Sequence, residues 1–335
     1  MVCVLMSTYN GEKYLEEQLE SLVRQEGVEI RILVRDDGSK DATADIVKRW
    51  QAKYPEMIEF VQGENVGFAM SFTHLLQMAV ERYPAVEYFA FCDQDDVWLP
   101  EKLRVAVERL EMEAKDIPVI YCSNTRLVDT NLRFMRMCWE KGEARLSKER
   151  ALIQSFATGC TMVFNRKAAE IYVSHLPEVI KVHDFLMYQL CMFLGKVIYD
   201  ENSYILYRQH GGNQIGQPGF RKRWQRRWTS GNYKKHTLEL QNYRFLKAYK
   251  DLLSVDDIGL ISQIAFYRKN LFTKLSLLFN NKIKYTRLKA NFFYMLKIII
   301  GGGVKRKICF QSGSHVCFLR YELAWVSRAD RWRRR

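Results

Sequence analysis

Three aspartates occur within four consecutive residues, at Asp93, Asp95 and Asp96, directly after an apolar run that ends at Cys92. Carboxylates at positions i and i+2 after a strand can reach the same hard divalent cation. A cation held by one or two carboxylates completes its coordination with phosphate oxygens and water. An isolated cluster of this kind is also common in solvated loops. The spacing makes a site for Mg²⁺ or Mn²⁺ and a phosphate-containing substrate the first hypothesis.

Similar polar clusters follow three other apolar, β-rich runs of the sequence. Strands are predicted at residues 2–6, 30–34, 58–61 and 87–92. Polar residues begin directly after each run, at 7–10, 36–37, 65–67 and 93–96. Apolar residues between the strands recur at helical spacing, so the sequence predicts an α/β fold with a mostly parallel sheet flanked by helices. Ligands of such sheets bind beyond the carboxyl ends of the strands, and we therefore expect the four loops to meet at one rim.

The polar clusters also match, in order, the motifs of a known enzyme family. The matching segments are Ser7-Thr8-Tyr9-Asn10-Gly11-Glu12, Arg35-Asp36-Asp37-Gly38-Ser39-Lys40-Asp41, Asn65-Val66-Gly67, Phe91-Cys92-Asp93-Gln94-Asp95-Asp96-Val97-Trp98, Gly159-Cys160-Thr161, His183-Asp184 and Tyr207-Arg208-Gln209-His210. Over residues 1–217 the chain resembles the family 2 glycosyltransferases, inverting enzymes with the GT-A-type nucleotide-diphosphosugar transferase fold. The Asp-Gln-Asp-Asp-Val-Trp and Tyr-Arg-Gln-His-Gly forms are most similar to the rhamnosyltransferase branch, which builds bacterial surface polysaccharides.

The resemblance implies transfer of a sugar from a nucleotide-diphosphosugar donor, with dTDP-rhamnose as the best match, to a lipid-linked saccharide acceptor. A UDP-hexose-dependent transferase of the same fold is the alternative. A nucleotidyltransferase would also use aspartate-bound metal, but the chain has no glycine-rich phosphate loop followed by a basic cluster near residue 1. Release of a nucleoside diphosphate rather than pyrophosphate would separate the two kinds of enzyme.

On the donor side, the resemblance assigns roles residue by residue. Asp37 matches the aspartate that accepts the N3–H of uracil or thymine, and Asp36 is either a second donor contact or structural. Asp95 matches the metal ligand, with Asp93 contacting the metal, the ribose or metal-bound water. His210 is a further metal ligand or a diphosphate contact, and Arg208 pairs with phosphate or closes a strand end. The remaining donor-binding residues are Thr8, Tyr9, Glu12, Asn65 and Gly67.

On the acceptor side, Asp184 matches the catalytic base. Direct displacement with inversion needs one carboxylate opposite the leaving group to take the proton of the acceptor hydroxyl. The residue before it is more often Glu in the family, and here it is His183. A neutral imidazole lowers the negative charge beside Asp184, or it packs in the core. Gly159 permits close approach of the acceptor or forms a plain turn, and Trp98 completes the acceptor-side set.

Charge divides the chain into two parts. Residues 218–335 contain 27 lysines and arginines against 6 aspartates and glutamates, whereas residues 1–217 contain 25 against 32. The division predicts a transferase domain at 1–217 and a basic, amphipathic helical extension at 218–335 that binds an anionic membrane surface. The mixed cations and indoles of residues 221–228 also suit a nucleic-acid-binding protein. An acidic rim repels a polyanion, so no nucleic-acid partner is expected.

The sequence also predicts a location for the protein. It begins without a basic, apolar signal segment, and its most apolar stretch, residues 292–304, is interrupted by Lys297 and three glycines. The eight cysteines include no Cys-x-x-Cys pair, and we expect reduced thiols buried in the core. These features predict a cytoplasmic enzyme, peripheral on the inner face of the cell membrane.

Overall fold

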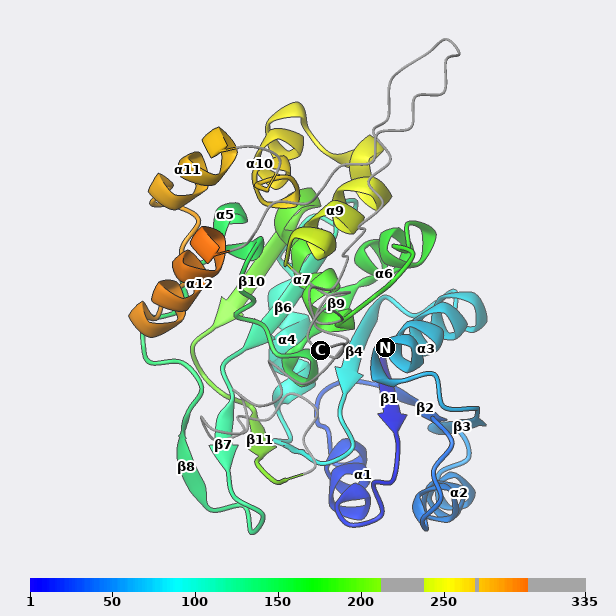
Figure 1. The fold of residues 1–335 in the computed structure, drawn as a ribbon. Coiled ribbons are helices and arrows are strands. Elements are labelled where there is room, and N and C mark those ends of the chain that lie inside the picture. Colours follow the sequence, from blue (N-terminus) through cyan, green and yellow to red (C-terminus); the bar gives the residue numbers. More distant parts are fainter. Residues whose placement is uncertain (212–237, 269–270, 301–335) are drawn as a thin grey trace, which may run out of the picture.

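A computed structural model describes residues 1–211, 238–268 and 271–300 (Figure 1). A seven-stranded sheet of order β10-β6-β9-β4-β1-β2-β3 forms its centre. Every pairing in this sheet is parallel except those of β9 with β4 and β6. The strands are β1 (Val2–Thr8), β2 (Ile30–Asp36), β3 (Ile58–Gln62), β4 (Tyr88–Cys92), β6 (Val119–Ser123), β9 (Val163–Asn165) and β10 (Lys196–Asp200). The predicted α/β class with a mostly parallel sheet is confirmed.

Helices cover both faces of the sheet because its strands alternate side chains between two cores. Cys3 and Leu5 of β1 belong to one core, and Val2, Val4 and Met6 belong to the other. The second core takes apolar residues from α1 (Leu15–Val23), α2 (Thr43–Lys53) and α4 (Lys102–Glu111). The first core takes them from α3 (Phe68–Arg82), α6 (Arg166–Ser174), α7 (His183–Leu194) and helices nearer the end of the chain.

A second sheet of order β5-β11-β7-β8 lies beyond the carboxyl end of β4. Its strands are β5 (Val97–Trp98), β11 (Ile205–Arg208), β7 (Arg126–Val128) and β8 (Phe134–Met137). β11 pairs with β5, so Ile205 lies opposite Trp98. This pairing brings the Arg208–His210 segment against the aspartate cluster, although more than one hundred residues separate them in sequence.

The helices that follow residue 237 pack on the transferase core. α9 (Leu238–Tyr249), the 3₁₀ turn η3 (Lys250–Leu252) and α10 (Val255–Ala265) lead to α11 (Leu271–Phe279) and α12 (Leu288–Ile300). Phe245 of α9 contacts Phe193 of α7, with ring centroids 5.6 Å apart. In the part of the chain that the structure describes, no helix has the length and apolarity that crossing a membrane requires.

The predicted domain boundary at 217/218 and the basic–aromatic segment 221–228 lie outside the described residues. The division into a transferase domain and a membrane-binding extension therefore stays a prediction. Six of the eight cysteines lie in the described ranges, and all six are free thiols. Five of the six are buried, as the sequence predicts: Cys3, Cys92, Cys122, Cys160 and Cys191.

Candidate active site

The four polar loops meet at the carboxyl ends of β1, β2, β3 and β4, which are neighbours in the sheet. Hydrogen bonds connect them. The backbone N–H of Asn10 donates to Ser39 Oγ at 2.9 Å, and the Asn10 side chain accepts from the N–H of Lys40 at 2.9 Å. Asn10 has a positive φ of 47°, a conformation that asparagine tolerates better than most residues. The predicted single rim is therefore present.

Asp37 fixes the loop that follows β3. Its carboxylate accepts the backbone N–H groups of Val66 at 3.0 Å and Gly67 at 2.9 Å, and it forms an ion pair with Arg35. Gly67 has a φ of 83°, which only glycine adopts readily. An ionised carboxylate has about four acceptor positions, so these three donors leave one position open on a residue that is 2% exposed. Asn65 lies exposed in the same loop.

Asp36 and Thr8 are buried beneath the rim. The Thr8 hydroxyl donates to Asp36 Oδ1 at 3.0 Å, and the backbone N–H and hydroxyl of Ser39 also donate to this carboxylate. Both residues are 0% exposed. The arrangement favours the structural alternative for Asp36, and it places the Thr8 hydroxyl inside the loop. Glu12 likewise binds the protein, because its side chain accepts the N–H of Ala42 at 2.9 Å.

Gln94 is a residue that the sequence argument missed. Its side-chain oxygen accepts the N–H of Tyr9 at 2.8 Å, and its side-chain nitrogen donates to the Tyr9 carbonyl at 3.1 Å. A Cβ on Gly11 would come within 2.3 Å of Gln94 Oε1, so the glycine allows this close approach. The Tyr9 side chain is 42% exposed. Gln94 thus joins the first loop to the aspartate loop.

Asp95 and His210 form a pair at the end of β11. Nε2 of His210 lies 2.7 Å from Oδ2 of Asp95. The imidazole also contacts the Tyr14 ring, with the two ring centroids 4.9 Å apart. Arg208 binds the same loop, since its backbone N–H donates to Asp96 Oδ1 at 3.0 Å and its Nε donates to the Asp95 carbonyl at 2.9 Å. Arg208 is 1% exposed and also binds Thr130 and Glu17. Its guanidinium therefore positions the aspartate loop.

Asp93, Asp96 and Cys160 form the cluster that fits a metal ion. Their ligand atoms lie within 4.8 Å of one another, and Oδ2 of Asp96 is buried without a hydrogen-bond partner. Burial, with the charges of Asp95 and Asp184, raises the pKa of Asp93 to about 8. Burial also raises the pKa of Asp96 well above its ordinary value, with added repulsion from Asp95 and Asp93. A hard divalent cation would satisfy the orphaned oxygen and offset this repulsion.

Asp184 lies at the start of α7, beside this cluster. Its carboxylate accepts the N–H of Gly159 at 3.0 Å and of Phe185 at 2.6 Å. Burial raises the pKa of Asp184 to about 6, despite these backbone donors. The charge of Asp184 in turn helps to raise the pKa of Asp93, so the two carboxylates share one region of the site. A base with this pKa is ionised at neutral pH and still accepts a proton readily.

Gly159 begins the 3₁₀ turn η1 (Gly159–Thr161), which separates the two halves of the site. A Cβ at Gly159 would lie 3.2 Å from both Cβ and Oδ2 of Asp184. The next residue, Cys160, faces Asp93 and Asp96 instead. One short turn thus sets the position of the predicted base relative to the metal cluster.

His183 packs in the core behind Asp184. Its ring stacks on the Phe72 ring with a centroid distance of 4.0 Å, and it meets the Phe91 ring edge-on with a centroid distance of 4.7 Å. Both ring nitrogens are buried without a hydrogen-bond partner, and burial lowers the pKa of His183 to about 3. The imidazole is therefore neutral at physiological pH. A neutral imidazole beside Asp184 is one of the two alternatives that the sequence leaves open, and packing in the core is the other. It lines the site without adding charge.

Trp98 is not brought to the rim with the other predicted acceptor-side residues. It is 2% exposed, and its ring contacts the ammonium group of Lys102 at 3.4 Å. Burial lowers the pKa of Lys102 to about 8. This pair supports the aspartate loop from beneath, and direct contact between Trp98 and an acceptor has no support in this arrangement.

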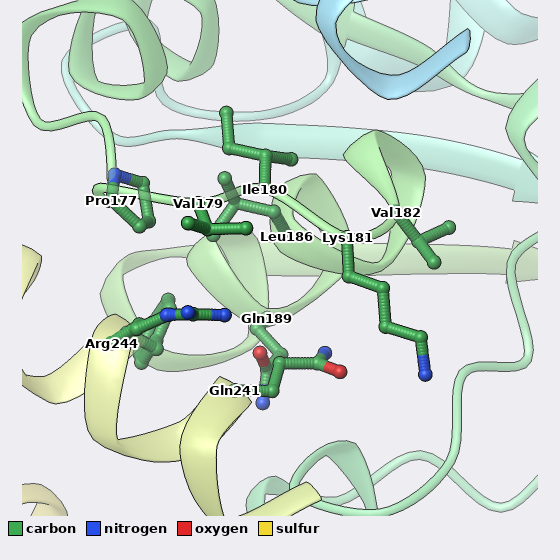
Figure 2. A pocket seen from close by; sticks show the side chains of 10 residues that line it. Pro177, Val179, Ile180, Lys181, Val182, Leu186, Gln189, Gln241 and Arg244 are labelled. Carbon is green, nitrogen blue, oxygen red and sulfur yellow. The ribbon is translucent and has the colours of Figure 1, made fainter. Parts of the chain in front are cut away.

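A small pocket lies between α7 and α9 (Figure 2). Leu186 and Gln189 of α7 line one side, Gln241 and Phe245 of α9 line the other, and loop residues 177–182 close it. Leu186 is two positions after Asp184, which corresponds to roughly 200° around a helix. The pocket therefore lies on the opposite side of α7 from the Asp184 carboxylate.

Comparison with known proteins decides the family. The model of glycosyl transferase family 2 matches residues 3–172, which is half of the chain and contains all four rim loops, the aspartate cluster among them. The chain belongs to glycosyl transferase family 2. It is therefore a transferase enzyme, as the sequence predicts.

Individual relatives agree with this assignment. The dTDP-rhamnosyl transferase RfbG of Shigella flexneri is 27% identical over 309 residues, which cover 88% of this chain and 99% of RfbG. An uncharacterized glycosyltransferase of Nostoc is 27% identical over 221 residues, which cover 63% of this chain and 66% of that protein. Among solved structures, Staphylococcus aureus TarS in complex with UDP-GlcNAc matches 82% of this chain and 76% of the TarS chain, with a TM-score of 0.54 and 18% identity. This likeness confirms the GT-A fold.

Proposed function

We propose that this enzyme transfers a sugar from a nucleotide-diphosphosugar to a saccharide hydroxyl with inversion at the anomeric carbon. The observation that carries the proposal is the position of Asp184. It lies at the start of α7, hydrogen-bonded to Gly159, close enough to the aspartate cluster for its charge to act on Asp93. One short turn thus contacts Asp184 through Gly159 and the aspartate cluster through Cys160, which supports direct displacement.

In the proposed reaction, Asp184 takes the proton of the acceptor hydroxyl while that oxygen attacks the anomeric carbon. A bond forms between the acceptor oxygen and the anomeric carbon, and the bond from that carbon to the diphosphate oxygen breaks. The nucleoside diphosphate leaves with the bonding electrons. A divalent cation held by Asp93 and Asp96, with Asp95 and His210 beside them, would neutralise the diphosphate.

The donor nucleotide lies, in this proposal, over the loops that follow β1 and β2. Tyr9 offers its exposed ring, and Asp37 accepts the N3–H of uracil or thymine with its remaining acceptor position. Asn65 and Gly67 border the same opening. The similarity to RfbG over nearly its whole length supports dTDP-rhamnose as the donor. A UDP-hexose is the alternative, because Asp37 would accept the same N3–H from uracil.

The acceptor is, in this proposal, a lipid-linked saccharide at the inner face of the cell membrane. The excess of lysine and arginine in residues 218–335 supports such a location, because anionic headgroups attract cations. A nucleic-acid partner has less support, since the rim gathers the carboxylates of Asp93, Asp95 and Asp96, which would repel a polyanion.

A donor screen tests this function. Melting temperatures would be measured with dTDP-, UDP- and GDP-linked sugars in the presence of Mg²⁺ or Mn²⁺, since a bound ligand stabilises the folded state in proportion to its occupancy. We expect the largest rise with dTDP-rhamnose and release of dTDP when an acceptor is added. A larger rise with a UDP-hexose would favour the alternative donor, and release of pyrophosphate would refute sugar transfer.

A further inference from the structure

Helices α11 and α12 expose a continuous set of large apolar side chains. Nine of these side chains are each at least 38% exposed: Leu271, Phe272, Leu275, Phe279, Leu288, Phe292, Phe293, Leu296 and Ile299. Within α12 the exposed positions 288, 292, 296 and 299 follow helical spacing and share one side of the helix. Figure 1 shows both helices at the edge of the molecule, far from α1 and α2. Monomeric proteins rarely leave so many large apolar groups together in water.

The opposite sides of these helices are buried, so the exposed set cannot turn inward. Leu277, Tyr294 and Ile298 are at most 8% exposed and belong to the same core as the sheet. The turn between the helices is fixed to the transferase core as well. The N–H of Thr286 donates to Gln154 Oε1 at 3.1 Å, and Arg287 pairs with Glu143 at 2.8 Å.

The charge of this helix pair indicates the chemistry of its partner. Residues 271–300 contain six lysines and arginines and no aspartate or glutamate. A segment that combines exposed bulky apolar side chains with basic residues and contains no acidic ones complements an apolar layer bordered by anions. A bilayer that contains anionic lipids has both properties over a broad area.

We propose that the outward side of α11 and α12 is a membrane-docking surface, with Phe272, Phe279 and Phe292 inserted among the acyl chains of anionic lipids. The purpose of this docking rests on the proposed lipid-linked acceptor. Arg150 also ties the turn between the two helices to the rest of the protein, because it donates to the carbonyl of Lys284 at 3.1 Å. Docking would therefore hold the domain that carries the site at the bilayer surface.

Vesicle binding by the full chain tests the proposal. Flotation would be measured with phosphatidylcholine vesicles and with vesicles that contain equal amounts of phosphatidylcholine and phosphatidylglycerol. Loss of one inserted phenyl ring weakens partitioning roughly tenfold, so the double variant Phe272→Ser/Phe279→Ser should bind the mixed vesicles roughly 100-fold less tightly. Phe134→Ser is the matched control, because Phe134 is 61% exposed on β8 and lies outside the helix pair.

Vesicle binding at high salt concentration distinguishes insertion of apolar side chains from attraction between charges. At about 0.5 M NaCl the screening length is only a few ångströms, so insertion should keep part of the wild type on mixed vesicles while the double variant is released. Equal binding of the double variant and the wild type would refute the proposal. So would a wild-type dimer in lipid-free buffer that the double variant converts to a monomer, because a second copy would then be the occupant. If the enzyme proved not to transfer a sugar, the vesicle results would be unchanged. The test of the docking surface is therefore independent of the test of the proposed function.

Discussion

The side-chain amide of Gln94 forms two hydrogen bonds with the backbone of Tyr9, one in each direction. This pair joins the loop after β1, where the nucleoside is proposed to bind, to the loop that holds Asp93, Asp95 and Asp96. The two loops are 85 residues apart in sequence. The two loops follow the paired strands β1 and β4, and this side chain adds a direct connection between the loops themselves.

Gln94→Ala should therefore weaken donor binding. Two hydrogen bonds contribute about 0.5 to 1.5 kcal/mol each, so we expect the KM for the donor to rise roughly 5- to 100-fold. The change in kcat should be smaller, because Asp184 is untouched. Gln62→Ala is the matched control, since Gln62 is an exposed residue of β3. An unchanged donor KM in Gln94→Ala would show that the pairing has no role in donor binding.

Gly159→Ala should displace the proposed base. The added methyl group would lie 3.2 Å from Cβ and Oδ2 of Asp184 and would push the carboxylate from its position. A displacement of about 1 Å can reduce the rate by roughly 100-fold, so the shift of a few tenths of an ångström that this contact requires should lower kcat roughly several-fold with donor binding retained. In the control Gly259→Ala, the methyl group meets no atom within 4 Å on α10. A Gly159→Ala enzyme with the wild-type kcat would show that this contact does not matter.

The pH dependence of kcat should report the ionisation of Asp184. Burial raises its pKa from an ordinary 3.8 to about 6, and only the ionised form accepts a proton. With metal and donor saturating, kcat should therefore rise roughly tenfold per pH unit below pH 6 and level off above it. The profile would be followed by nucleoside diphosphate release between about pH 3.5 and about pH 8. A midpoint near 4 would indicate a solvated carboxylate instead.

Asp95→Ala should abolish the metal-dependent part of donor binding. Asp95 lies 2.7 Å from His210 and beside the Asp93–Asp96 cluster, and few carboxylates are available to hold the cation. The rise in melting temperature that donor and Mn²⁺ produce together should disappear, and excess chelator should have the same effect on the wild type. Asp45→Ala is the control, because the Asp45 side chain is 77% exposed on α2. Full activity in chelator would contradict the metal assignment.

Much of the fold could be predicted because local patterns determine it. The continuous apolar runs of β1 and β4 are buried on both faces of the sheet, and the spacing of Leu15, Leu19 and Leu22 places them in one core. The sequence does not predict β5, and it indicates β11 only through the possible strand end at Arg208. β5 has two residues, and its existence depends on pairing with β11 from a distant part of the chain, which no local pattern reveals.

The candidate site divides in the same way. The meeting of the loops that carry Asp37, Asp93, Asp95 and Asp96 follows from their places after parallel strands, whereas Asp184 was assigned by the resemblance alone. The partners of each side chain depend on tertiary distances and do not follow from either. Thus Arg208, expected at a phosphate or at a strand end, binds the backbone of the aspartate loop, and Trp98, expected beside an acceptor, packs on Lys102. No local sequence pattern identifies Gln94, because its close approach to Gly11 exists only in the folded chain.

The central claim is that Asp184 removes the proton from the acceptor hydroxyl, and Asp184→Asn tests it most directly. Loss of a general base costs on the order of 10² to 10⁴ in rate, whereas a role limited to the transition state leaves the donor affinity nearly unchanged. Release of nucleoside diphosphate would be measured for wild type and variant, with donor affinity measured in parallel. The account predicts a fall in kcat of at least roughly 100-fold with an unaltered donor Kd. A variant that keeps more than about a tenth of the wild-type kcat would contradict it.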